Sequence, residues 1–573
     1  MIFRRAGILA AILALTSSAA FSADCLMGRY APDQQSFTSE KLQMPIALNW
    51  EYTGSKFDNN PASPVVVGRV CYFACGTYLY AIDLDTGNKK WQYPSEQPLS
   101  SPIKSTPAIY EDNIYFSSVD GNLYCIDAET GRFEWAFQTR GPIRCSPVVI
   151  DGVVYVAADD NSVYAIDAET GDATWNRPFV AKDDFAPSIA IGSGMAVVAC
   201  MDGNLYGLSL STGKLRWMAR LSEAPVRTAP IIVDNQVVMA IGGVIYGFTV
   251  RSGQMKWMIK LPHDAAASPA SDGVDIYIPC TDKKIYAYTL TGRQPTMKWT
   301  SPADIGTNLM SNPIVADKVV FVAGSKGTIA GYSTEDGSLK WRYGVAPSTI
   351  TSPGQTYTDA ASSPTVANGN LLVLTDDGVL HCFSTNAPDG EPPVDFNLVP
   401  ATGSAMSGMP PIKISAVLYD IGSGVDFDGL TMMLDGSPVD CKKDPSTFTV
   451  SYVTEVGGEG KAARKLLDGI HNISISAKDY AGNQLNREWF FYVDNTLPPP
   501  KRAVPAETGK KTTTDKKNSR NKPSRGFNAP RQSYSSGSTD SGASAPPPPP
   551  PPMPAIGPNA SGADMPAPPS PGQ

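Results

Sequence analysis

Residues 147–175 read PVVIDGVVYVAADDNSVYAIDAETGDATW, three short β-branched runs separated by Asp-Gly and Asp-Asp-Asn turns and followed by a tryptophan. Such runs have the length and composition of strands and lack the 3.6-residue periodicity of a helix. The pattern recurs, because tryptophans follow one another at intervals of 40 to 44 residues: Trp50, Trp91, Trp135, Trp175, Trp217, Trp257, Trp299 and Trp341. A repeat of this length predicts a solenoid or a propeller.

Two further markers keep the same phase as the tryptophans. One is a proline, usually after Ser or Ala, that precedes an apolar run: Pro64, Pro107, Pro147, Pro187, Pro230, Pro269, Pro313 and Pro364. The other is an Asp-x-x-Thr-Gly turn, as in AIDAETG at residues 165–171. Four strands per unit and about eight units predict an all-β fold, an eight-bladed β-propeller over residues 47–390.

The two ends of the repeat are expected to complete each other. The last unit has three strands and lacks a tryptophan strand, whereas IALNWEYTG at residues 46–54 is a tryptophan strand with nothing before it. We expect this segment to form the outer strand of the last blade, which would remove an open sheet edge. We expect the eight tryptophans to pack between neighbouring blades from the outer strands.

The unit A-x-D-x-x-T-G-x-x-x-W resembles the PQQ-type propeller repeat of quinoprotein dehydrogenases and of the BamB-type outer-membrane assembly factor. The resemblance covers about residues 47–385. It implies either protein binding in outer-membrane protein assembly or a PQQ-dependent oxidoreductase. For the enzyme it also implies an adjacent cysteine pair, Ca²⁺ and an Asp base on long insertions. Adjacent cysteines do not occur here and most repeats are short, so we expect no cofactor, no catalytic residue and no enzyme.

Residues 394–496 have a different rhythm. IKISAVLYDIGSGVD at 412–426 and GIHNISISAKDYAGN at 469–483 alternate apolar and polar residues, and their Asp-rich turns resemble those of bacterial immunoglobulin-like or fibronectin-like sandwiches. The resemblance implies a role in spacing or adhesion, with carbohydrate binding as an alternative. Asp420, Asp426 and Asp428 offer oxygen ligands to Ca²⁺, but the same residues are ordinary turn formers.

The ends of the chain and its charge suggest export. Residues 1–23 have two arginines, a short apolar run and small residues, as in an export signal, and residues 24–46 form a leader. Asp24 before Cys25 does not fit a lipobox. Residues 497–573 are proline-rich and basic, so we expect a disordered tail. The chain has a formal charge of −8 and three histidines, which argues against nucleic-acid binding and a multi-histidine metal centre. No other segment approaches transmembrane length.

The nine cysteines are expected to be structural thiols. Cys75, Cys200 and Cys280 share one repeat position with Ser118, Ala158 and Gly324, as expected for small core residues. Cys71 and Cys75 would lie about 13 Å apart along one strand, too far for a disulfide.

One rim of the propeller is the predicted working face. Lys104, Arg144, Asp184 and Arg227 each stand three residues before a marker proline, so we expect them around the channel mouth. They could form a binding rim, with a local positive arc for an acidic peptide segment, or merely a solvated edge. The long connection Gly344–Ser363 is a candidate docking loop. The sequence therefore predicts an exported scaffold that binds envelope or surface proteins, in the periplasm, at the outer-membrane periphery or on the cell surface.

Overall fold

The protein is described here from a computed structural model, in which the following residues are placed: 24–55, 62–185, 188–221, 228–309, 311–345, 359–360, 362–455 and 465–499. In these residues the secondary structure is strand, apart from one 3-10 turn at Pro445–Thr447. The predicted export signal at 1–23, Arg227 and the predicted tail from residue 500 onward lie outside the described residues. The helices of the described part include none long and apolar enough to cross a membrane.

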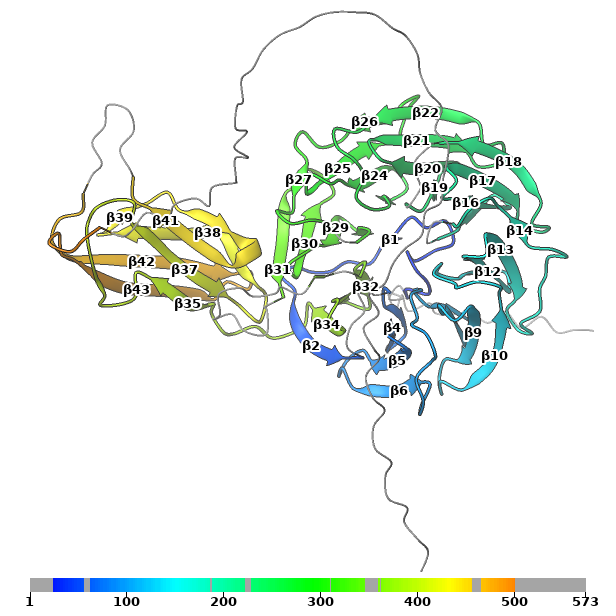
Figure 1. The fold of residues 1–573 in the computed structure, drawn as a ribbon, viewed down its shortest axis with the longest axis horizontal. Helices are drawn as coiled ribbons and strands as arrows, with labels where there is room; N and C mark the ends of the chain where they lie inside the picture. The colour runs from blue at the N-terminus through cyan, green and yellow to red at the C-terminus, as the bar shows by residue number, and fades with distance from the viewer. Residues whose placement is uncertain are drawn as a thin grey trace, which may run out of the picture. The chain divides into compact units, whose positions relative to one another are not determined.

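Eight sheets, numbered 1 to 8 along the chain, form a ring in the described residues (Figure 1). Sheet 1 contains β3 (Val65–Val67), β4 (Val70–Cys75), β5 (Tyr78–Asp83) and β6 (Lys89–Tyr93). Sheet 2 contains β7 (Ala108–Tyr110), β8 (Asn113–Ser117), β9 (Asn122–Asp127) and β10 (Phe133–Gln138). Sheet 3 contains β11 (Val148–Ile150), β12 (Val153–Ala158), β13 (Ser162–Asp167) and β14 (Phe179–Val180). Sheet 4 contains β15 (Ala190–Gly192), β16 (Met195–Ala199), β17 (Asn204–Ser209) and β18 (Leu215–Arg220).

The second half of the ring repeats this plan. Sheet 5 contains β19 (Ile231–Val233), β20 (Gln236–Ile241), β21 (Val244–Thr249) and β22 (Met255–Lys260). Sheet 6 contains β23 (Ala270–Ser271), β24 (Asp275–Pro279), β25 (Lys284–Thr289), β26 (Thr296–Met297) and β27 (Ala303–Asp304). Sheet 7 contains β28 (Ile314–Ala316), β29 (Val319–Ala323), β30 (Thr328–Ser333) and β31 (Leu339–Gly344). Sheet 8 contains β32 (Thr365–Ala367), β33 (Asn370–Leu374) and β34 (Val379–Ser384).

The ring closes through the start of the chain, as the sequence predicts. Strand β2 (Ala47–Thr53) is antiparallel to β34 and forms the outer strand of sheet 8. Its Trp50 donates its indole N–H to the carbonyl of Leu84 in sheet 1, at 2.9 Å. Strand β2 therefore connects sheet 8 to sheet 1.

The tryptophans connect neighbouring sheets by the same kind of contact. In four further seams an indole N–H donates to a backbone carbonyl of the next sheet, at 2.7–3.2 Å: Trp135 to Ala168, Trp175 to Leu210, Trp217 to Val250 and Trp299 to Thr334. The Thr-Gly turn of the next sheet lies against the indole of the tryptophan. At Gly171, φ is +78° and a Cβ would approach Trp135 to 2.8 Å, so the turn requires glycine. Five of the eight predicted tryptophans thus contact the next sheet through the indole N–H, whereas Trp257 donates its indole N–H to Gln236 of its own sheet at 2.9 Å.

Two tryptophans differ from the prediction in their place on the sheet. Trp175 and Trp299 precede or follow short strands and do not lie within an outer strand. Both are followed by x-x-Pro, and pairing resumes at Phe179 and Ala303, immediately after the proline. Proline has no N–H to donate, so the outer strand is interrupted there. The contact with the next sheet survives because it depends on the indole and not on the strand.

The Ser-Pro marker forms a second belt, on the channel side of the ring. The side chain before the marker proline accepts the backbone N–H of its counterpart one sheet earlier, at 2.8–3.1 Å. Five such bonds are present: Ser63 to Thr106, Thr106 to Ser146, Ala229 to Ser268, Ser268 to Asn312 and Asn312 to Ser363. The marker thus has a physical cause, since a short polar side chain at this position satisfies a backbone donor of the neighbouring sheet.

The leader runs through the centre of the ring (Figure 1). Strand one of each sheet has a free inner edge, and the leader pairs with these edges in order. Backbone bonds of 2.6–2.9 Å join Cys25 to Val66, Leu26 to Ile109, Pro32 to Ile191, Asp33 to Ile232, Gln35 to Ser271 and Ser36 to Val315. Strand β1 (Phe37–Thr38) then pairs in parallel with β28. The leader therefore contacts sheets 1, 2 and 4 to 7 through its backbone.

Two side chains of the leader fix its path. Arg29 donates to the carbonyl of Pro269 and to the hydroxyl of Ser36. Burial lowers the pKa of Arg29 to about 9. The Glu40 carboxylate accepts the backbone N–H of Asn368 and of Gly369 in sheet 8. The sequence did not predict this arrangement, because the leader has no repeated pattern.

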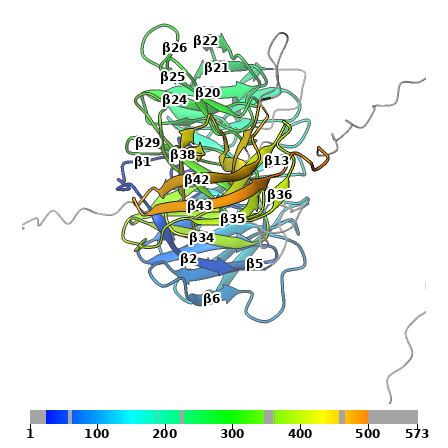
Figure 2. The same cartoon turned by 90° about the vertical axis from the view of Figure 1, so that its left-hand side faces the viewer.

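A second β unit follows the ring. One sheet contains β35 (Val394–Val399), β37 (Lys413–Tyr419), β41 (Thr449–Val453) and β40 (Lys442–Asp444). The other contains β36 (Ala405–Met406), β43 (Gln484–Val493), β42 (Gly469–Asp479), β38 (Val425–Leu434) and β39 (Ser437–Pro438). Figure 2 shows β42 and β43 side by side. Ile414, Val450, Ile475 and Trp489 from both sheets share one buried core, so this is a two-layer unit, here called the two-sheet unit.

The cysteines are structural, as predicted. All nine are free and eight are buried. Burial raises the pKa of Cys145 and of Cys280 to about 12, so these thiols stay protonated at neutral pH. Protonated buried thiols act as small apolar residues.

The leader contacts generate the first prediction. Deleting residues 24–42, which leaves β2 intact, removes backbone partners from the inner strands of six sheets. Each such hydrogen bond contributes about 0.5–1.5 kcal/mol net. We expect a loss of several kcal/mol in the free energy of unfolding, measured by calorimetry. Adding a synthetic peptide of residues 24–42 should restore part of the melting temperature, and an unchanged melting temperature after deletion would refute a structural role for the leader.

Candidate functional site

The segments that carry the predicted rim residues lie beside the turns that follow strand two. The segment that enters strand one pairs with the end of strand two in the same sheet, which brings two sets of turns together. Five bridges show this: Ile103 with Ser118, Phe185 with Cys200, Ala265 with Cys280, Leu309 with Gly324 and Ala360 with Thr375. We call this edge the acidic rim, for the carboxylates described below.

The predicted rim residues have different environments. Arg144 forms an ion pair with Asp159, which lies at the adjoining turn. Burial lowers the pKa of Lys104 below its ordinary value. Arg227 lies outside the described residues. The cationic arc expected at the mouth is therefore partly neutralised by the neighbouring carboxylate.

Asp184 occupies a different repeat position from the one predicted. Its carbonyl accepts the N–H of Met201, as the carbonyl of Pro142 accepts that of Asp159. Asp184 is thus equivalent to Pro142, two residues before Arg144. The prediction relied on Pro187, but Ser188 and Ile189 occupy the Ser-Pro position in sheet 4, since β15 begins at Ala190 as β11 begins at Val148. Burial and the charge of Asp183 raise the pKa of Asp184 above its ordinary value. Arg144 lies close enough to oppose this shift in part.

Four Asp–Tyr pairs stand at one repeat position on the acidic rim. Each aspartate follows strand two, and the tyrosine four residues later donates its hydroxyl to the carboxylate at 2.5–2.8 Å. The pairs are Asp120 with Tyr124, Asp160 with Tyr164, Asp202 with Tyr206 and Asp282 with Tyr286. Equal repeat position places them at one radius around the mouth, and all four aspartates are only half-buried.

The hydrogen bonds set the charge of this rim. Burial raises the pKa of Asp202, but the bonds from Tyr206 and Cys200 outweigh it, so the pKa lies below its ordinary value. The phenol is affected in the opposite sense, and the pKa of Tyr164 rises to about 12 by burial and by the bond to Asp160. Asp202 is therefore ionised and Tyr164 neutral at physiological pH.

The sequence contains a signal for these pairs that is not among the three repeat markers. The spacing Asp-x-x-x-Tyr occurs as DGNLY at 120–124, DNSVY at 160–164, DGNLY at 202–206 and DKKIY at 282–286. A four-residue spacing across a tight turn into a strand brings the two side chains together. Further carboxylates on this edge are Asp183, Asp264, Asp359, Asp376 and Asp377.

The ring and the two-sheet unit meet at a second site, the seam between sheets 7 and 8. Three successive carbonyls of the loop after β37 accept bonds from the ring. Ile421 accepts the Tyr343 hydroxyl, Gly422 the Leu48 N–H and Ser423 the Trp341 indole, at 2.9–3.0 Å. At Gly424, φ is +89° and a Cβ would lie 2.7 Å from the Arg342 carbonyl oxygen, so this approach requires glycine.

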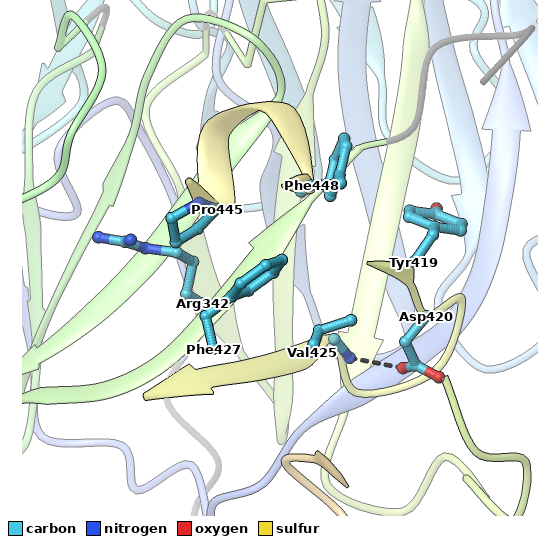
Figure 3. Close-up of a pocket in the computed structure, with 9 residues that line it drawn as sticks. Arg342, Tyr419, Asp420, Val425, Phe427, Pro445 and Phe448 are labelled. Atoms are coloured by element: carbon cyan, nitrogen blue, oxygen red, sulfur yellow. Dashed lines mark hydrogen bonds between the residues drawn. The ribbon is translucent and has the colours of Figure 1, made fainter. Parts of the chain in front are cut away.

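A small pocket lies at this junction (Figure 3). It has an empty volume of about 270 Å³, and its apolar wall includes Val425, Phe427, Pro445 and Phe448. Asp420 lies at its edge and accepts the N–H of Gly424 at 2.7 Å. The pocket is too small for a drug-sized ligand and serves as the packing seam of the two units.

The predicted calcium ligands are not brought together. Asp426 accepts the N–H groups of Asp428 and Gly429, as a turn former does. Asp420 instead has Asp389 and Asp479 as neighbours, with carboxylate oxygens within 4.8 Å of one another. This set could offer hard oxygen ligands to a cation such as Ca²⁺. It joins three segments far apart in the sequence, which is why spacing alone did not reveal it.

Burial makes Asp420 a weak acid. Its pKa rises to about 7 by desolvation, and the charges of Asp389 and Asp479 add to this effect, whereas the Gly424 bond opposes it. The docking loop predicted at Gly344–Ser363 is largely outside the described residues, which omit 346–358 and 361.

The comparisons with known proteins agree on the ring. A family model described as "Outer membrane protein assembly factor BamB" matches residues 47–126, 76–243 and 229–394, together more than half of the chain. BamB of Salmonella typhimurium is 24% identical over 213 residues, which cover 35% of this chain and 50% of that protein. The 1-butanol dehydrogenase (cytochrome c) of Thauera butanivorans is 29% identical over 119 residues, 19% of this chain and 17% of the enzyme.

Other similar proteins belong to different classes. The serine/threonine-protein kinase AfsK of Streptomyces griseus is 27% identical over 189 residues, which cover 32% of this chain and 19% of the kinase. Among solved structures, quinohemoprotein alcohol dehydrogenase ADHIIG from Pseudomonas putida HK5 aligns with a TM-score of 0.51 at 14% identity, covering 68% of this chain and 83% of that enzyme. The chain spans half or less of the length of these curated relatives, and the structural likeness shows a β-propeller fold alone.

Among the described residues, the acidic rim holds no group of three side chains that could bind a metal ion. Within the placed residues, the group of three acidic or other metal-binding side chains that could hold an ion is Asp389, Asp420 and Asp479, in and beside the two-sheet unit. The resemblance to quinoproteins implies adjacent cysteines above the cofactor, and this chain has none.

The junction contact can be tested at Trp341. In Trp341→Phe the aromatic ring remains but the Ser423 carbonyl, which is fully buried, loses its donor. Leaving such a group unpaired costs about 1–3 kcal/mol. Glu391 is exposed and lies in the segment that connects sheet 8 to the two-sheet unit. Because a weaker junction opens more often, we expect a glutamate-specific protease to cleave after Glu391 faster than in the wild type. Trp217→Phe makes the same change at a seam inside the ring and should leave that cleavage rate unchanged; equal rates in all three proteins would contradict the docking role.

The acidity of Asp420 predicts how stability depends on pH. Its folded pKa, about 7, lies above the unfolded value near 3.8, so the folded protein binds the proton more tightly. This stabilisation is present below about pH 4 and is lost as pH rises through 7. Asp420→Asn keeps an acceptor for Gly424 and removes the charge. In EDTA, we expect its melting temperature to exceed that of the wild type at pH 8, by a margin that shrinks as the pH falls and disappears below about pH 4; a constant difference would contradict the assignment.

Proposed function

Because the chain belongs to the family of the outer membrane protein assembly factor BamB, we propose that it is an exported, non-enzymatic scaffold that binds proteins of the bacterial envelope. The relatives include both BamB and alcohol dehydrogenases, so the choice rests on the site. The rim offers repeated, hydrogen-bonded carboxylates, and the described residues place no group of three metal-binding side chains there. A surface of fixed, half-buried polar groups around a channel mouth is suited to binding.

The single observation that supports this proposal is the ring of Asp–Tyr pairs. A carboxylate that accepts a phenol hydroxyl has a fixed orientation, so less side-chain entropy is lost when a partner binds. The pairs recur in sheets 2, 3, 4 and 6 at one repeat position. A partner segment that crosses the mouth can therefore meet several equivalent acceptors.

The charge of the partner follows from the same residues. An acidic peptide was the expectation from Lys104, Arg144 and Arg227. Arg144 is paired with Asp159, and the surrounding turns supply carboxylates. We therefore propose that the rim selects segments that bring Lys, Arg or backbone N–H donors, as an extended strand of an envelope protein does.

The finer architecture belongs to the same proposal. We interpret the eight sheets as an eight-bladed propeller and the two-sheet unit as an immunoglobulin-like domain. Residues 1–23 would direct export, and the basic tail from 497 to 573 would act as a spacer. These assignments place the protein in the periplasm, at the outer-membrane periphery or on the cell surface, and an adhesion role for the two-sheet unit is compatible with them.

Charge reversal on the rim tests the proposal. In Asp183→Lys/Asp264→Lys, two exposed carboxylates of the acidic rim become cations. We expect capture of outer-membrane proteins from a detergent extract to fall severalfold at low salt, quantified by mass spectrometry, with a melting temperature close to the wild type. Surface substitutions of this kind usually change stability by less than about 0.5 kcal/mol.

The matched control is Glu129→Lys/Glu169→Lys. It makes the same charge change at exposed positions of the Thr-Gly turns, away from the rim. This control should capture the same proteins as the wild type. Equal capture by all three proteins would show that the rim is only a solvated edge.

A further inference from the structure

The outer strands of sheets 4 and 5 repeat one order of side-chain types. Strand β18 reads LRWMAR and β22 reads MKWMIK, so each has an apolar residue, a cation, the seam tryptophan, a methionine, an apolar residue and a second cation. Both strands lie at the periphery of the ring (Figure 1). Four of these side chains are about half exposed, and we call them the methionine patch: Leu215 (47%), Met218 (57%), Met255 (55%) and Met258 (53%).

A bulge puts each pair on one face of its sheet. In sheet 4, Leu215 opposes Leu208, Trp217 opposes Gly207 and Met218 opposes Tyr206. Residue 216 is therefore the extra residue, and Leu215 and Met218 point to the same face, opposite the tryptophan. Met255 and Met258 have the same register in sheet 5. Each sheet thus presents two exposed apolar side chains on the face that the seam tryptophan does not use.

The fold does not require these residues. Four other sheets have the same bulge, and the two equivalent positions there are Lys89 and Gln92, Phe133 and Ala136, Leu339 and Arg342, and Leu48 and Glu51. None of these pairs combines two large apolar side chains. The methionine patch is therefore a local feature of two neighbouring sheets, and a clustered exposed apolar surface usually marks an interaction site.

The charge around the patch indicates what covers it. Strands β18 and β22 carry four cations, among them Arg216, Lys256 and Lys260, and no acidic residue. The turns before them add Lys214 and Arg251. The chain as a whole has a formal charge of −8, so this region is an exception. A complementary occupant is anionic and offers apolar contact.

We propose that the methionine patch binds an anionic lipid surface. Unbranched methionine side chains adapt to an irregular apolar boundary. Long cationic side chains beside them can keep their charged ends at the headgroups while their stems lie along the apolar region. Strand addition by a protein partner fits less well, because the bulge at each tryptophan interrupts a regular edge. The proposal adds a membrane contact to the rim function and does not depend on it.

Co-sedimentation with vesicles tests the proposal. The full mature chain is mixed with vesicles of phosphatidylglycerol and phosphatidylcholine, or with phosphatidylcholine alone. We expect binding to the anionic vesicles, weakening as salt rises. Met218→Asn/Met258→Asn should lower the partition coefficient about tenfold or more, since two apolar side chains no longer enter the headgroup boundary.

The control removes two other exposed methionines. Met409→Asn/Met433→Asn acts in the two-sheet unit, where these side chains are 42% and 39% exposed, and should bind like the wild type. The basic tail is present in every variant, so the difference between the two pairs measures the methionine patch alone. If Met218→Asn/Met258→Asn does not fold, as judged by circular dichroism, Arg216→Gln/Lys256→Gln at exposed positions is expected to show a comparable loss.

Three results would overturn the proposal. The wild type could show no preference for anionic vesicles at low salt. The patch variant could bind as well as the wild type, or the control could lose as much as the patch variant. If the wild type ignores both vesicles while the patch variant loses a co-purifying acidic protein, the patch is a protein docking site and the lipid assignment is wrong.

Discussion

Ring closure depends on how each sheet holds the next. Each four-stranded sheet has two faces that must be covered. Near the outer strands of the ring, one indole covers much of the face between two neighbouring sheets. The indole packs on a glycine-containing turn of the next sheet, and its N–H donates to a carbonyl of the same turn, as between Trp217 and Val250. One side chain thus combines a large apolar contact with a directional bond. The contact tolerates interrupted outer strands, as Trp175 and Trp299 show, because it needs only the position of the indole.

On the inside of the ring, the backbone edges of the first strands must be paired. The Ser-Pro belt joins neighbouring sheets, but the innermost strands still have free backbone edges, and free edges invite pairing with other chains. The leader pairs with these edges in order around the channel, from Val66 in sheet 1 to Val315 in sheet 7. The leader is therefore part of the core, and the channel cannot serve as an open passage where the leader lies. This favours binding at the rim over binding within the channel.

The sequence predicted the features that repeat and missed those that do not. Each of its three markers corresponds to one contact: tryptophan to the seam, Ser-Pro to the inner belt and Thr-Gly to the turn beneath the indole. The leader pairs through its backbone, so no side-chain pattern could reveal it. Asp184 was misplaced because sheet 4 has its proline two residues early, and the charge of the rim was misjudged because the pairing of Arg144 with Asp159 depends on distance. The Asp-x-x-x-Tyr spacing is an exception, because it repeats in four sheets and yet its meaning depends on the turn that brings the two side chains together.

The junction shows how a second unit can be attached without weakening the ring. Sheet 8 lacks the glycine-containing turn that in sheets 1 to 5 and 7 receives the tryptophan of the preceding sheet. The loop Ile421–Ser423 takes its place, and Trp341 donates to Ser423 as Trp299 donates to Thr334. Two more bonds, from Tyr343 and Leu48, bind the same loop. Burying this loop also buries Asp420 beside two other carboxylates, which is unfavourable when all three are ionised. The strength of the junction between the ring and the two-sheet unit therefore depends on pH.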